Sequence, residues 1–496
     1  MNPFDKALAY IAPGLALKRE QSRRALAFYE AVKPSRYRKG KVERGSGDAA
    51  VSRGGAGVSL REQARHLDQN HDLSVGLLDA LVQNVVGPAG IQVEPQPRSV
   101  TDSTIHEGVA QQLLNFLRDW QKRPEVTWGH DWAGAQRIVA RTWLRDGEVF
   151  AQRLLGDVPS LVHGTQIPYS LELLESDFVP FDYEDAQSNV RMGIQRNAWN
   201  RPTAYYVFKK HPGDNLYLPT RDDLKVIPAE RMLHLKFTNR IGQARGASIF
   251  ASVLNRLDSI KDYEESEQVA AKVAASMAAY IIKGGTDHYS PDYHGGDAER
   301  DMHFRAGMIF DDLQPGESVG TIDTNRPNTS LEAHRKGQLR AVASGTRVTY
   351  SSLSRDYNGS YSSQRQELVE GYGAYGVLSS EMISGFVRPV YEDFVQAALL
   401  SRQLDIPSDV QRETLNDALY ITPQMPWIDP WKEAKAMESL ERNIHASGPE
   451  IIRRRGQNPR DVLEQEANWR KALLAHELIS DSDPRHDYEE PFDEDK

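Results

Sequence analysis

Residues 243–282 constrain the fold of this chain more than any other stretch. Gln243-Ala-Arg-Gly-Ala-Ser248 is followed by apolar residues at helical spacing and then by a tract of small residues that reaches Ala279. The apolar residues are Phe250, Val253, Leu254, Leu257 and Ile260. Recurrence every three to four residues is typical of one face of an α-helix. The sequence therefore predicts a long helix over about 247–282, whose small side chains let another helix approach closely.

Helical and strand-like patterns are mixed along the rest of the chain. Short β-type segments separated by Pro and Gly turns lie at 149–155, 169–174, 205–208 and 233–237, with a further strand at 91–94. Helical periodicity covers 60–86, 105–122, 131–145, 331–347 and 364–400. Ser59, with Glu62 three residues on, predicts the start of the first of these helices. The fold class predicted is a helix-rich α+β protein.

Proline marks several element boundaries. Asp429-Pro430, Ser447-Gly-Pro449 and Asn458-Pro459 each place a capping residue just before proline, which predicts three C-terminal helices. Pro389 is expected to kink the helix over 364–400, because proline removes a helix hydrogen bond. Residues 284–325 are rich in Gly, Asp and Pro, with brief strands expected at 308–310 and 319–322. They predict a small module between two helices.

Charge is concentrated at the two ends of the sequence. The formal net charge is −10, yet residues 1–45 are strongly basic and residues 480–496 strongly acidic. Such blocks are typical of solvated tails, or of arms that contact a partner or nucleic acid. Residues 45–58 contain glycine at high frequency and predict a flexible link. With no cysteine, the chain has no disulfide or thiolate site. The apolar stretch 269–282 is too short for a spanning helix, so no membrane association is expected.

Motifs for catalysis are missing from the sequence. There is no phosphate-binding Gly-x-x-x-x-Gly-Lys-Ser/Thr loop and no Gly-x-Ser-x-Gly nucleophile turn. His66 and His71 are five residues apart, which does not suit a zinc pair on a helix, and both are expected at the surface. We expect no catalytic residue, cofactor or metal. Acidic residues near 287–312, including Asp311-Asp312, leave a metal-dependent nuclease or hydrolase as the alternative.

Several segments together resemble one protein family. In chain order they are Asn84-Val-Val-Gly87, Arg145-Asp-Gly-Glu-Val-Phe150, Glu175-Ser-Asp-Phe-Val179, Gly242-Gln-Ala-Arg-Gly246, Leu313-Gln-Pro-Gly-Glu317, Asn358-Gly-Ser-Tyr-Ser-Ser-Gln-Arg365, Trp427-Ile-Asp-Pro-Trp-Lys-Glu-Ala434 and Arg455-Gly-Gln-Asn-Pro-Arg-Asp461. Their order resembles the lambda-type family of tailed-phage portal proteins over roughly residues 60–475. The turn at 193–206 departs from the family pattern, which tends to have an acidic residue and a glycine before the proline.

The resemblance implies a portal fold with wing, stem, clip and crown that assembles into a dodecameric ring. It implies this division: 1–58 basic N-terminal arm and linker, 59–245 wing, 246–283 stem helix 1, 284–326 clip, 327–349 stem helix 2, 350–362 tunnel loop, 363–429 wing return helix and connector, 430–479 crown, and 480–496 acidic tail.

Particular residues are expected to carry this role. Those expected at the DNA channel and tunnel loop are Arg335, Lys336, Arg340, Arg355, Tyr357, Asn358, Gly359 and Tyr361. Those expected to pack one stem against the next are Ala270, Ala271, Ala274, Ala275 and Ala278. A channel for DNA must not bind the duplex tightly. Subunits with a net negative charge, repeated around a ring, repel phosphate except where single cations are exposed.

The function that the resemblance implies is mechanical. A portal ring at one capsid vertex forms the channel for DNA packaging and ejection, nucleates head assembly, and docks terminase and neck proteins. The implied partners are the chain itself, double-stranded DNA, terminase, major capsid and scaffold proteins, and head-completion proteins. The implied location is the virion, with the host cytoplasm during assembly. Besides the nuclease, a DNA-binding module driven by the basic arm is a third interpretation, which predicts tight, salt-sensitive duplex binding.

Overall fold

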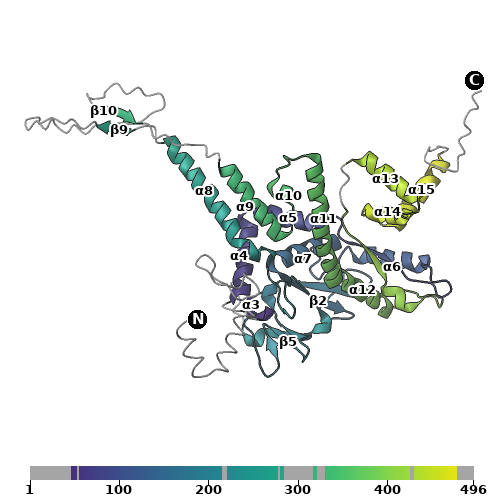
Figure 1. Cartoon of the computed structure of the whole chain (residues 1–496). Coiled ribbons are helices and arrows are strands. Elements are labelled where there is room, and N and C mark those ends of the chain that lie inside the picture. The colour runs from purple at the N-terminus through teal and green to yellow at the C-terminus, as the bar shows by residue number, and fades with distance from the viewer. Residues whose placement is uncertain are drawn as a thin grey trace, which may run out of the picture. The chain divides into compact units, whose positions relative to one another are not determined.

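The computed structural model describes residues 46–52, 55–214, 220–276, 280–283, 317–320, 330–424 and 429–476. The chain divides into two units, Met1–Ala50 and Val51–Lys496. Nearly all of the first unit lies outside the described residues, as do most of the expected clip and the whole acidic tail. The described residues from Val51 onward belong to the second unit and are drawn as ribbons in Figure 1.

Two sheets form the β part of residues 59–245, the segment predicted to be the wing. Strands β2 (Glu148–Leu155), β3 (Tyr169–Leu174) and β8 (Met232–Lys236) form an antiparallel sheet in the order β3-β2-β8. A second antiparallel sheet has the order β4-β5-β6-β7. Its strands are β4 (Val190–Arg191), β5 (Ile194–Arg196), β6 (Pro202–Phe208) and β7 (Leu224–Pro228). The strand predictions at 149–155, 169–174, 205–208 and 233–237 are confirmed.

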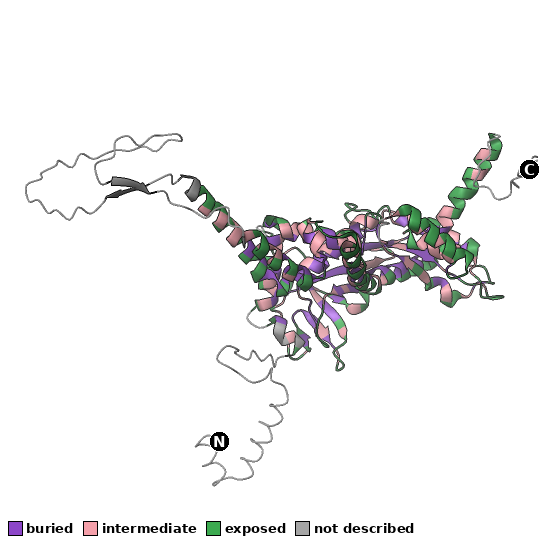
Figure 2. Cartoon of the chain, turned by 45° about the horizontal axis from the view of Figure 1, so that its top comes forward, coloured by how far each residue is buried: buried purple, intermediate pink, exposed green. Residues whose placement is uncertain are grey.

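The three-stranded sheet separates two cores. Successive strand residues point to opposite faces, so Val149 and Ala151 join the larger core, whereas Phe150 between them joins the smaller one. The larger core is helical and includes Trp120, Trp143 and Phe394. The smaller core contains residues from both sheets, including Phe150 of β2, Leu174 of β3, Ile194 of β5 and Val207 of β6. Figure 2 shows buried residues concentrated in this body of helices and sheets. The expected α+β class is confirmed.

The N-terminal helices differ from the expectation in two places. The structure has a short helix α3 (Gly47–Ser52) where a flexible link was predicted. The single helix predicted over 60–86 is two helices, α4 (Ala56–Asn70) and α5 (Asp72–Val85). His71 separates them because its backbone is extended, with φ −126° and ψ 111°. Ser59 lies inside α4 and accepts a hydrogen bond from Gln63, so it does not cap the helix.

His71 is buried, so its prediction as a surface residue was wrong. Its side chain is 3% exposed, and its Nε2 lies 3.2 Å from the backbone carbonyl oxygen of Leu257. The extended backbone at the break between α4 and α5 turns the ring inward. His66, by contrast, is exposed as expected.

Several other helices occur close to where the sequence placed them. They are α6 (Glu107–Trp120), α7 (Trp132–Asp146), α9 (Ser330–Thr346), α13 (Pro430–Arg442), α14 (Gly448–Arg454) and α15 (Pro459–Ala475). Asp131, Asp429, Ser447 and Asn458 cap the starts of α7, α13, α14 and α15 with their side chains. Each side chain accepts a backbone N–H that has no partner within the helix. Strand β1 (Gln92–Pro95) pairs with β11 (Ala418–Ile421).

The helix that returns through the wing changes its winding before Pro389. Helix α11 (Tyr361–Met382) continues through a π-helical turn, η7 (Ile383–Val387), into α12 (Arg388–Leu400). The N–H of Arg388 bonds to the carbonyl of Ile383, five residues back. A π-turn accommodates proline because the ring cannot donate and would clash with the preceding turn. The winding of the helix is therefore irregular just before Pro389, where the sequence predicted a kink, and the kink itself stays a prediction.

The segment predicted as stem helix 1 is not one continuous helix. It begins with a 3₁₀ turn, η6 (Ile249–Ser252), followed by α8 (Leu254–Ser276). Beyond it, β9 (Tyr280–Lys283) pairs with β10 (Glu317–Gly320), so helix over 280–282 was wrong and a strand near 319 is confirmed. Tyr280-Ile281-Ile282 are aromatic and β-branched residues that suit a strand. The strand expected at 308–310 lies outside the described residues.

Helices α13–α15, which lie in the segment predicted to be the crown, are held to β1 and α6 mainly by charge. Among the described residues of α13–α15, only Pro459 is buried. Glu94 on β1 is 2% exposed and accepts hydrogen bonds from Arg453 at 2.8 and 3.1 Å. Arg460 reaches Glu94 at 3.4 Å and Glu107 at 2.8 Å. Two arginines thus share one buried carboxylate, and they fix α14 and α15 against β1 and α6.

Candidate functional site

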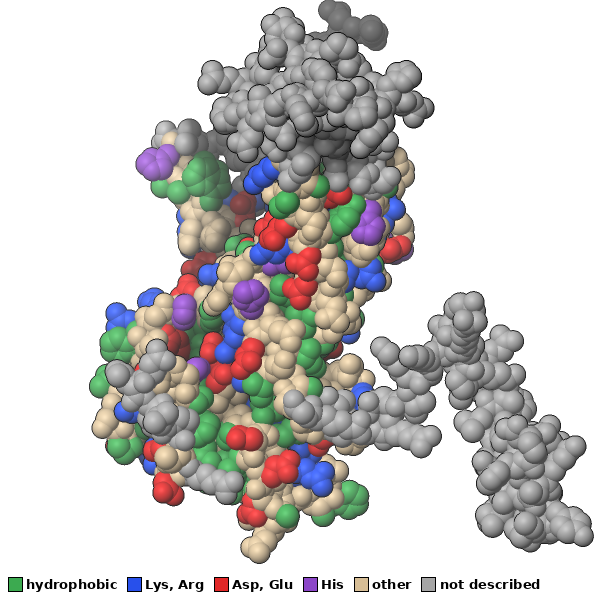
Figure 3. Space-filling view, turned by 90° about the vertical axis from the view of Figure 1, so that its left-hand side faces the viewer, with side chains coloured by type: hydrophobic (Ala, Val, Ile, Leu, Met, Phe, Trp, Pro, Cys, Tyr) green, Lys and Arg blue, Asp and Glu red, His purple; other side chains and the backbone are tan. Residues whose placement is uncertain are grey.

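The paired helices α8 and α9 carry the predicted stem residues. Arg335 on α9 pairs with Glu264 on α8 at 2.5 Å, and the rings of Tyr263 and His334 are 5.0 Å apart. Arg335 is therefore bound within the helix pair rather than directed outward as an isolated cation. Acidic and basic side chains intermingle on the stem face in Figure 3. Mixed charge on this face gives a duplex few places to bind by phosphate contact alone.

The predicted packing alanines are only partly visible. Ala270 is half-buried and Ala271 exposed on α8, so both have surface available for a neighbour. Ala274 and Ala275 belong to α8, but their side chains lie outside the described residues, and Ala278 lies outside them entirely. Stem-to-stem packing through these alanines stays a prediction.

The segment predicted as the tunnel loop begins with a helix. Residues 350–354 form α10 (Tyr350–Ser354), so the loop prediction was wrong for that part. Thr349 caps its start by accepting the N–H of Ser352, and Arg355 ends it in the left-handed conformation at φ 55°. Serine is common in capped turns because its hydroxyl bonds to nearby backbone groups. The true loop is residues 355–360, after which α11 begins at Tyr361.

The short loop holds most of the predicted contact residues at the surface. Tyr357 and Tyr361 are 59% and 55% exposed, and Arg355, Asn358 and Gly359 are exposed as well. The N–H of Asn358 donates to Asp356 at 3.1 Å, and that of Gly359 to the carbonyl of Tyr357 at 2.9 Å. These bonds fix the backbone of the loop while its side chains stay exposed.

Two further predicted cations lie beside this loop on α9. Lys336 contacts Glu332 at 2.7 Å and Asp356 at 3.5 Å, which connects α9 to the loop. The hydrogen bond to Glu332 raises the pKa of Lys336. Arg340 lies over the ring of Tyr350, 5.4 Å from its centroid. The structure thus brings Lys336, Arg340 and the 355–361 segment together, whereas Arg335 faces α8.

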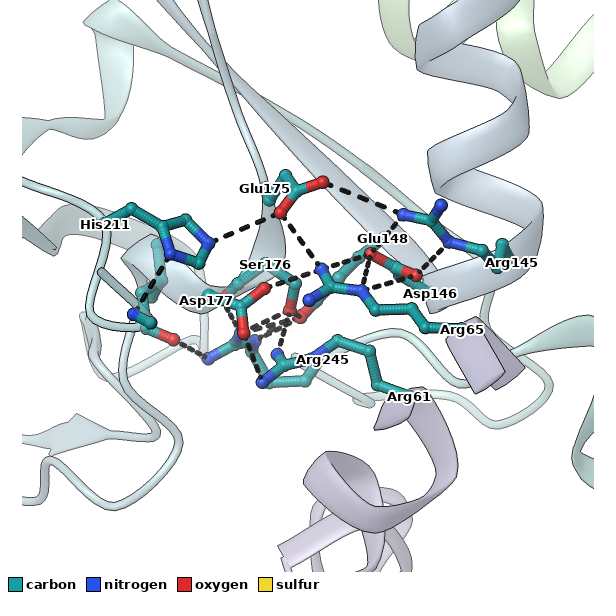
Figure 4. A network of polar contacts seen from close by, with 12 residues as sticks. Arg61, Arg65, Arg145, Asp146, Glu148, Glu175, Ser176, Asp177, His211 and Arg245 are labelled. Atoms are coloured by element: carbon teal, nitrogen blue, oxygen red, sulfur yellow. Dashed lines mark hydrogen bonds and ion pairs between the residues drawn. The ribbon is translucent and has the colours of Figure 1, made fainter. Parts of the chain in front are cut away.

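A buried ionic network lies just before the predicted stem segment, and no residue of it was predicted from the sequence as a site residue. Figure 4 shows Arg245 among Glu148, Ser176 and Asp177, with Arg61 and Arg65 approaching from α4. Arg245 is fully buried and contacts Glu148 at 2.6 Å. Its remaining N–H groups donate to the carbonyls of Val179 and Met192, at 3.1 and 2.8 Å. A buried guanidinium is tolerated because a carboxylate and carbonyls surround it.

Glu148 is the anion at the centre of this network. Burial alone would raise its pKa, but the Arg245 charge and hydrogen bonds from His234 and Arg245 hold the pKa far below its usual value. Burial lowers the pKa of His234 to about 4, although the neighbouring Glu148 favours the charged ring. His234 is therefore neutral at pH 7, with its Nε2 3.1 Å from Glu148 and its Nδ1 3.4 Å from the hydroxyl of Tyr205.

Two glycines let the backbones meet beside the network. A Cβ on Gly246 would lie 1.9 Å from the carbonyl oxygen of Gly147, and a Cβ on Gly147 would lie 2.4 Å from Ala247. Gly147 also has φ +91°, a left-handed conformation that favours glycine. The segments Arg145–Phe150 and Gly242–Gly246 therefore lie together. The 3₁₀ turn that leads into α8 begins three residues beyond Gly246, so this contact fixes the start of the predicted stem segment to the turn between α7 and β2.

Comparisons with known proteins decide the family. The model of the family described as phage portal protein, lambda family, matches residues 33–377. The chain belongs to the lambda family of phage portal proteins.

Named relatives are similar to this portal chain at low identity. The probable portal protein of Halomonas phage phiHAP-1 is 26% identical, covering 82% of this chain and 79% of the relative. Portal protein B of Escherichia phage lambda is 23% identical over 48% of this chain and 49% of its own length. The portal protein of Escherichia phage N15 is 22% identical over 56% and 58%.

Solved structures of gene transfer agent particles are also similar. A chain of the virion of the native particle has a TM-score of 0.45 and 13% identity, covering 81% of this chain and 94% of that chain. A chain of the native neck, computed with C12 symmetry, has a TM-score of 0.41 and 13% identity, with 79% and 89% covered.

One group of side chains in the portal has the composition of a metal site. Glu175, Asp177 and His211 bring three ligand atoms within 4.8 Å of one another. Arginines already neutralise the carboxylates: Arg65 contacts Asp177 at 2.6 Å and Glu175 at 3.4 Å. Arg61 contacts Asp177 at 3.0 Å. We interpret the group as part of the ionic network. The acidic residues of the nuclease alternative, 287–312, lie outside the described residues.

No described helix combines the length and the apolar character needed to cross a bilayer.

Proposed function

We propose that identical copies of this chain form a ring at one vertex of a phage capsid, and that double-stranded DNA passes through its centre. The ring takes DNA in during packaging and releases it during ejection, and it acts as a structural component without catalysis. The family match over residues 33–377 carries this proposal. The ring nucleates head assembly, and its further partners are terminase, major capsid, scaffold and neck proteins. It is located in the virion, after assembly in the host cytoplasm.

The surface proposed to face DNA consists of residues 355–361 together with Lys336 and Arg340. Tyrosine and asparagine side chains are exposed there, and three cations lie within the same group. Lys336 is neutralised in part by Glu332 and Asp356. Contacts of this kind touch a moving duplex without the strong, salt-dependent grip that many unpaired cations would produce. With a net charge of −10 per subunit, a ring repels phosphate elsewhere.

Particle imaging of the purified full chain tests the proposal. Annular particles with a central hole are the expected result, whereas compact monomers at high concentration contradict the ring. Duplex affinity and nuclease activity are measured on the same material, with and without divalent cations. Metal-dependent cleavage of DNA would support the nuclease alternative. Tight, salt-sensitive duplex binding by non-annular protein would support the DNA-binding module.

A second experiment addresses the proposed channel surface. Arg355→Ala, Arg340→Ala and Tyr357→Ala are compared with Val162→Ala, which alters an exposed residue far along the chain from the loop. All four variants are expected to assemble, because each altered side chain is exposed. Only the first three should change the amount of DNA packaged in assembled heads. Equal packaging by all four would remove residues 355–361 and Arg340 from the channel.

A further inference from the structure

One exposed tryptophan lies on an unusually well-fixed turn. Trp199 lies between β5 and β6 and is 89% exposed, more than any other described tryptophan. The next are Trp431 at 64%, over which Lys435 already lies at 4.1 Å, and Trp469 at 59%. Large aromatic side chains gain much free energy from burial. An indole held in water on a surface turn is therefore a candidate anchor for a partner.

The turn that bears Trp199 is preformed. The side-chain oxygen of Asn197 accepts the N–H of Trp199 at 2.9 Å and that of Arg201 at 3.0 Å. The N–H of Asn197 donates to the carbonyl of Arg201, and the N–H of Asn200 donates to that of Asn197. Asn200 adopts a left-handed conformation at φ 60°, which asparagine tolerates better than most residues. A rigid aromatic anchor loses little conformational entropy on binding.

The same chain carries a pocket suited to such an anchor. A cavity of about 390 Å³ lies between α7, β2 and β3. Its apolar lining includes Val139, Val149, Leu173 and Phe178, and Ile138 at its edge is 42% exposed. An apolar cavity of about 150 Å³ already holds a benzene. The pocket is therefore large enough for an indole, and Ile138 shows that it opens to the surface.

Carboxylates outnumber arginines in the pocket lining. Glu125, Glu172 and Glu175 line the pocket beside Arg141 and Arg145. Glu172 already pairs with Lys225 at 3.1 Å, and Glu175, which is 44% exposed, lies 3.4 Å from Arg65. The lining arginines are satisfied by acids: Arg141 contacts Asp68 and Asp79, and Arg145 contacts Asp146. The turn carries the exposed Arg201 and no acid from 196 to 201. A glutamate also offers the acceptor that a buried indole N–H requires.

We propose that Trp199 of one subunit inserts into this pocket of the next subunit, so that the two features form a repeated contact around the ring. The inference rests on the proposed function, because a closed ring needs two different surfaces of the same chain to meet head to tail. A knob and a pocket at separate places on one chain supply such a pair. Contact of Trp199 with its own copy would instead produce a two-fold dimer.

The absence of cysteine from the chain permits a direct test by cross-linking. The full-length variant with both Ala198→Cys and Ile138→Cys keeps Trp199 and places one cysteine on the exposed turn beside it. It is oxidised and run on a denaturing gel without reductant. A ladder of covalent oligomers is expected, and each single variant should remain monomeric. Dimers from Ala198→Cys alone would overturn the proposal in favour of a two-fold contact. Annular particles that form without any covalent ladder would also overturn it.

A second measurement separates this contact from folding and from the ring itself. Trp199→Ala should raise the concentration needed for half-assembly at least tenfold, with Trp199→Phe intermediate. Val226→Ala is the matched control, since Val226 is 55% exposed in the same four-stranded sheet. Thermal unfolding of the monomer should be equal in all of these proteins. Unchanged assembly of Trp199→Ala overturns the contact alone, whereas lack of annular particles from the unaltered chain contradicts the proposed function.

Discussion

The buried pair of His234 and Glu148 makes a quantitative prediction about pH. His234 has a pKa of about 4 in the folded chain because it is buried, against an ordinary value of about 6.5 in an unfolded one. Between these values the unfolded state binds more protons, so the folded state loses stability as pH falls. The contribution of His234 to the free energy of unfolding is fully present above about pH 7, and it is lost as the pH falls from about 6.5 towards 4.

The magnitude follows from the two pKa values. Protonation of His234 with these pKa values lowers the free energy of unfolding by about 2 kcal/mol between pH 7 and pH 5. The loss reaches about 3 kcal/mol once the pH is below both pKa values. Glu148 does not contribute in that range, since its pKa is lowered from a starting value that is already below pH 5. The window from pH 7 to pH 5 therefore isolates the histidine.

His234→Gln removes the titration but keeps an amide that can donate to Glu148. Denaturant unfolding of both proteins is measured at pH 7, 6 and 5, at subunit concentrations too low for assembly. The unaltered protein should lose about 2 kcal/mol more than His234→Gln over this range. Acid-sensitive groups elsewhere affect both proteins equally and cancel in the difference. Parallel pH profiles would refute the claim that His234 is buried and neutral beside Glu148.

Three further predictions concern packing and the crown. Gly246→Ala should destabilise the fold by more than about 3 kcal/mol, because the added Cβ would meet the carbonyl oxygen of Gly147. Gly337→Ala on α9 should stabilise the fold by about 0.5–1 kcal/mol, because there is open space around its Cβ. Thermal unfolding checks both variants, and equal effects would disprove the close approach at Gly246. Glu94→Gln should speed hydrogen exchange in α14 and α15 by removing the charge shared by Arg453 and Arg460, and Glu450→Gln, which alters an exposed pair with Arg454, is the control; unchanged exchange would mean that other contacts hold the crown. Arg245→Met should lower the free energy of unfolding by about 3–5 kcal/mol, since it leaves the carboxylate of Glu148 buried without its main partner; a denaturant midpoint like that of the unaltered protein would contradict this.

The sequence predicted elements well where the signal was local. Capping residues such as Asp429 and Asn458, and the alternating strands of the wing, depend on neighbours a few residues away, and the structure confirmed them. The break at His71 depends on a contact with Leu257, 186 residues distant, which no local pattern records. The helix at 350–354 was missed because Tyr-Ser-Ser-Leu-Ser has weak helical preference and depends on the Thr349 cap.

The candidate site was predictable only in part. The exposed segment 355–361 could be recognised from its composition and from the family resemblance, yet the pairing of Arg335 with α8 could not, since it depends on how two helices pack. Arg245 was visible in the sequence within a family segment, but nothing in the sequence indicated Glu148 as its partner. The available signal was the joint presence of two glycine-containing segments, Arg145–Phe150 and Gly242–Gly246.

The contact between those two segments limits which substitutions the chain can accept during evolution. Glu148 and Arg245 are 97 positions apart in the sequence. The backbones beside them are nevertheless in direct contact at Gly147 and Gly246, which have no side chains. Replacement of either glycine by alanine would force the opposite backbone segment to move. The two segments are therefore expected to change together in evolution. A hybrid protein that joins the first half of one portal chain to the second half of another should fold only if the two halves match at this contact.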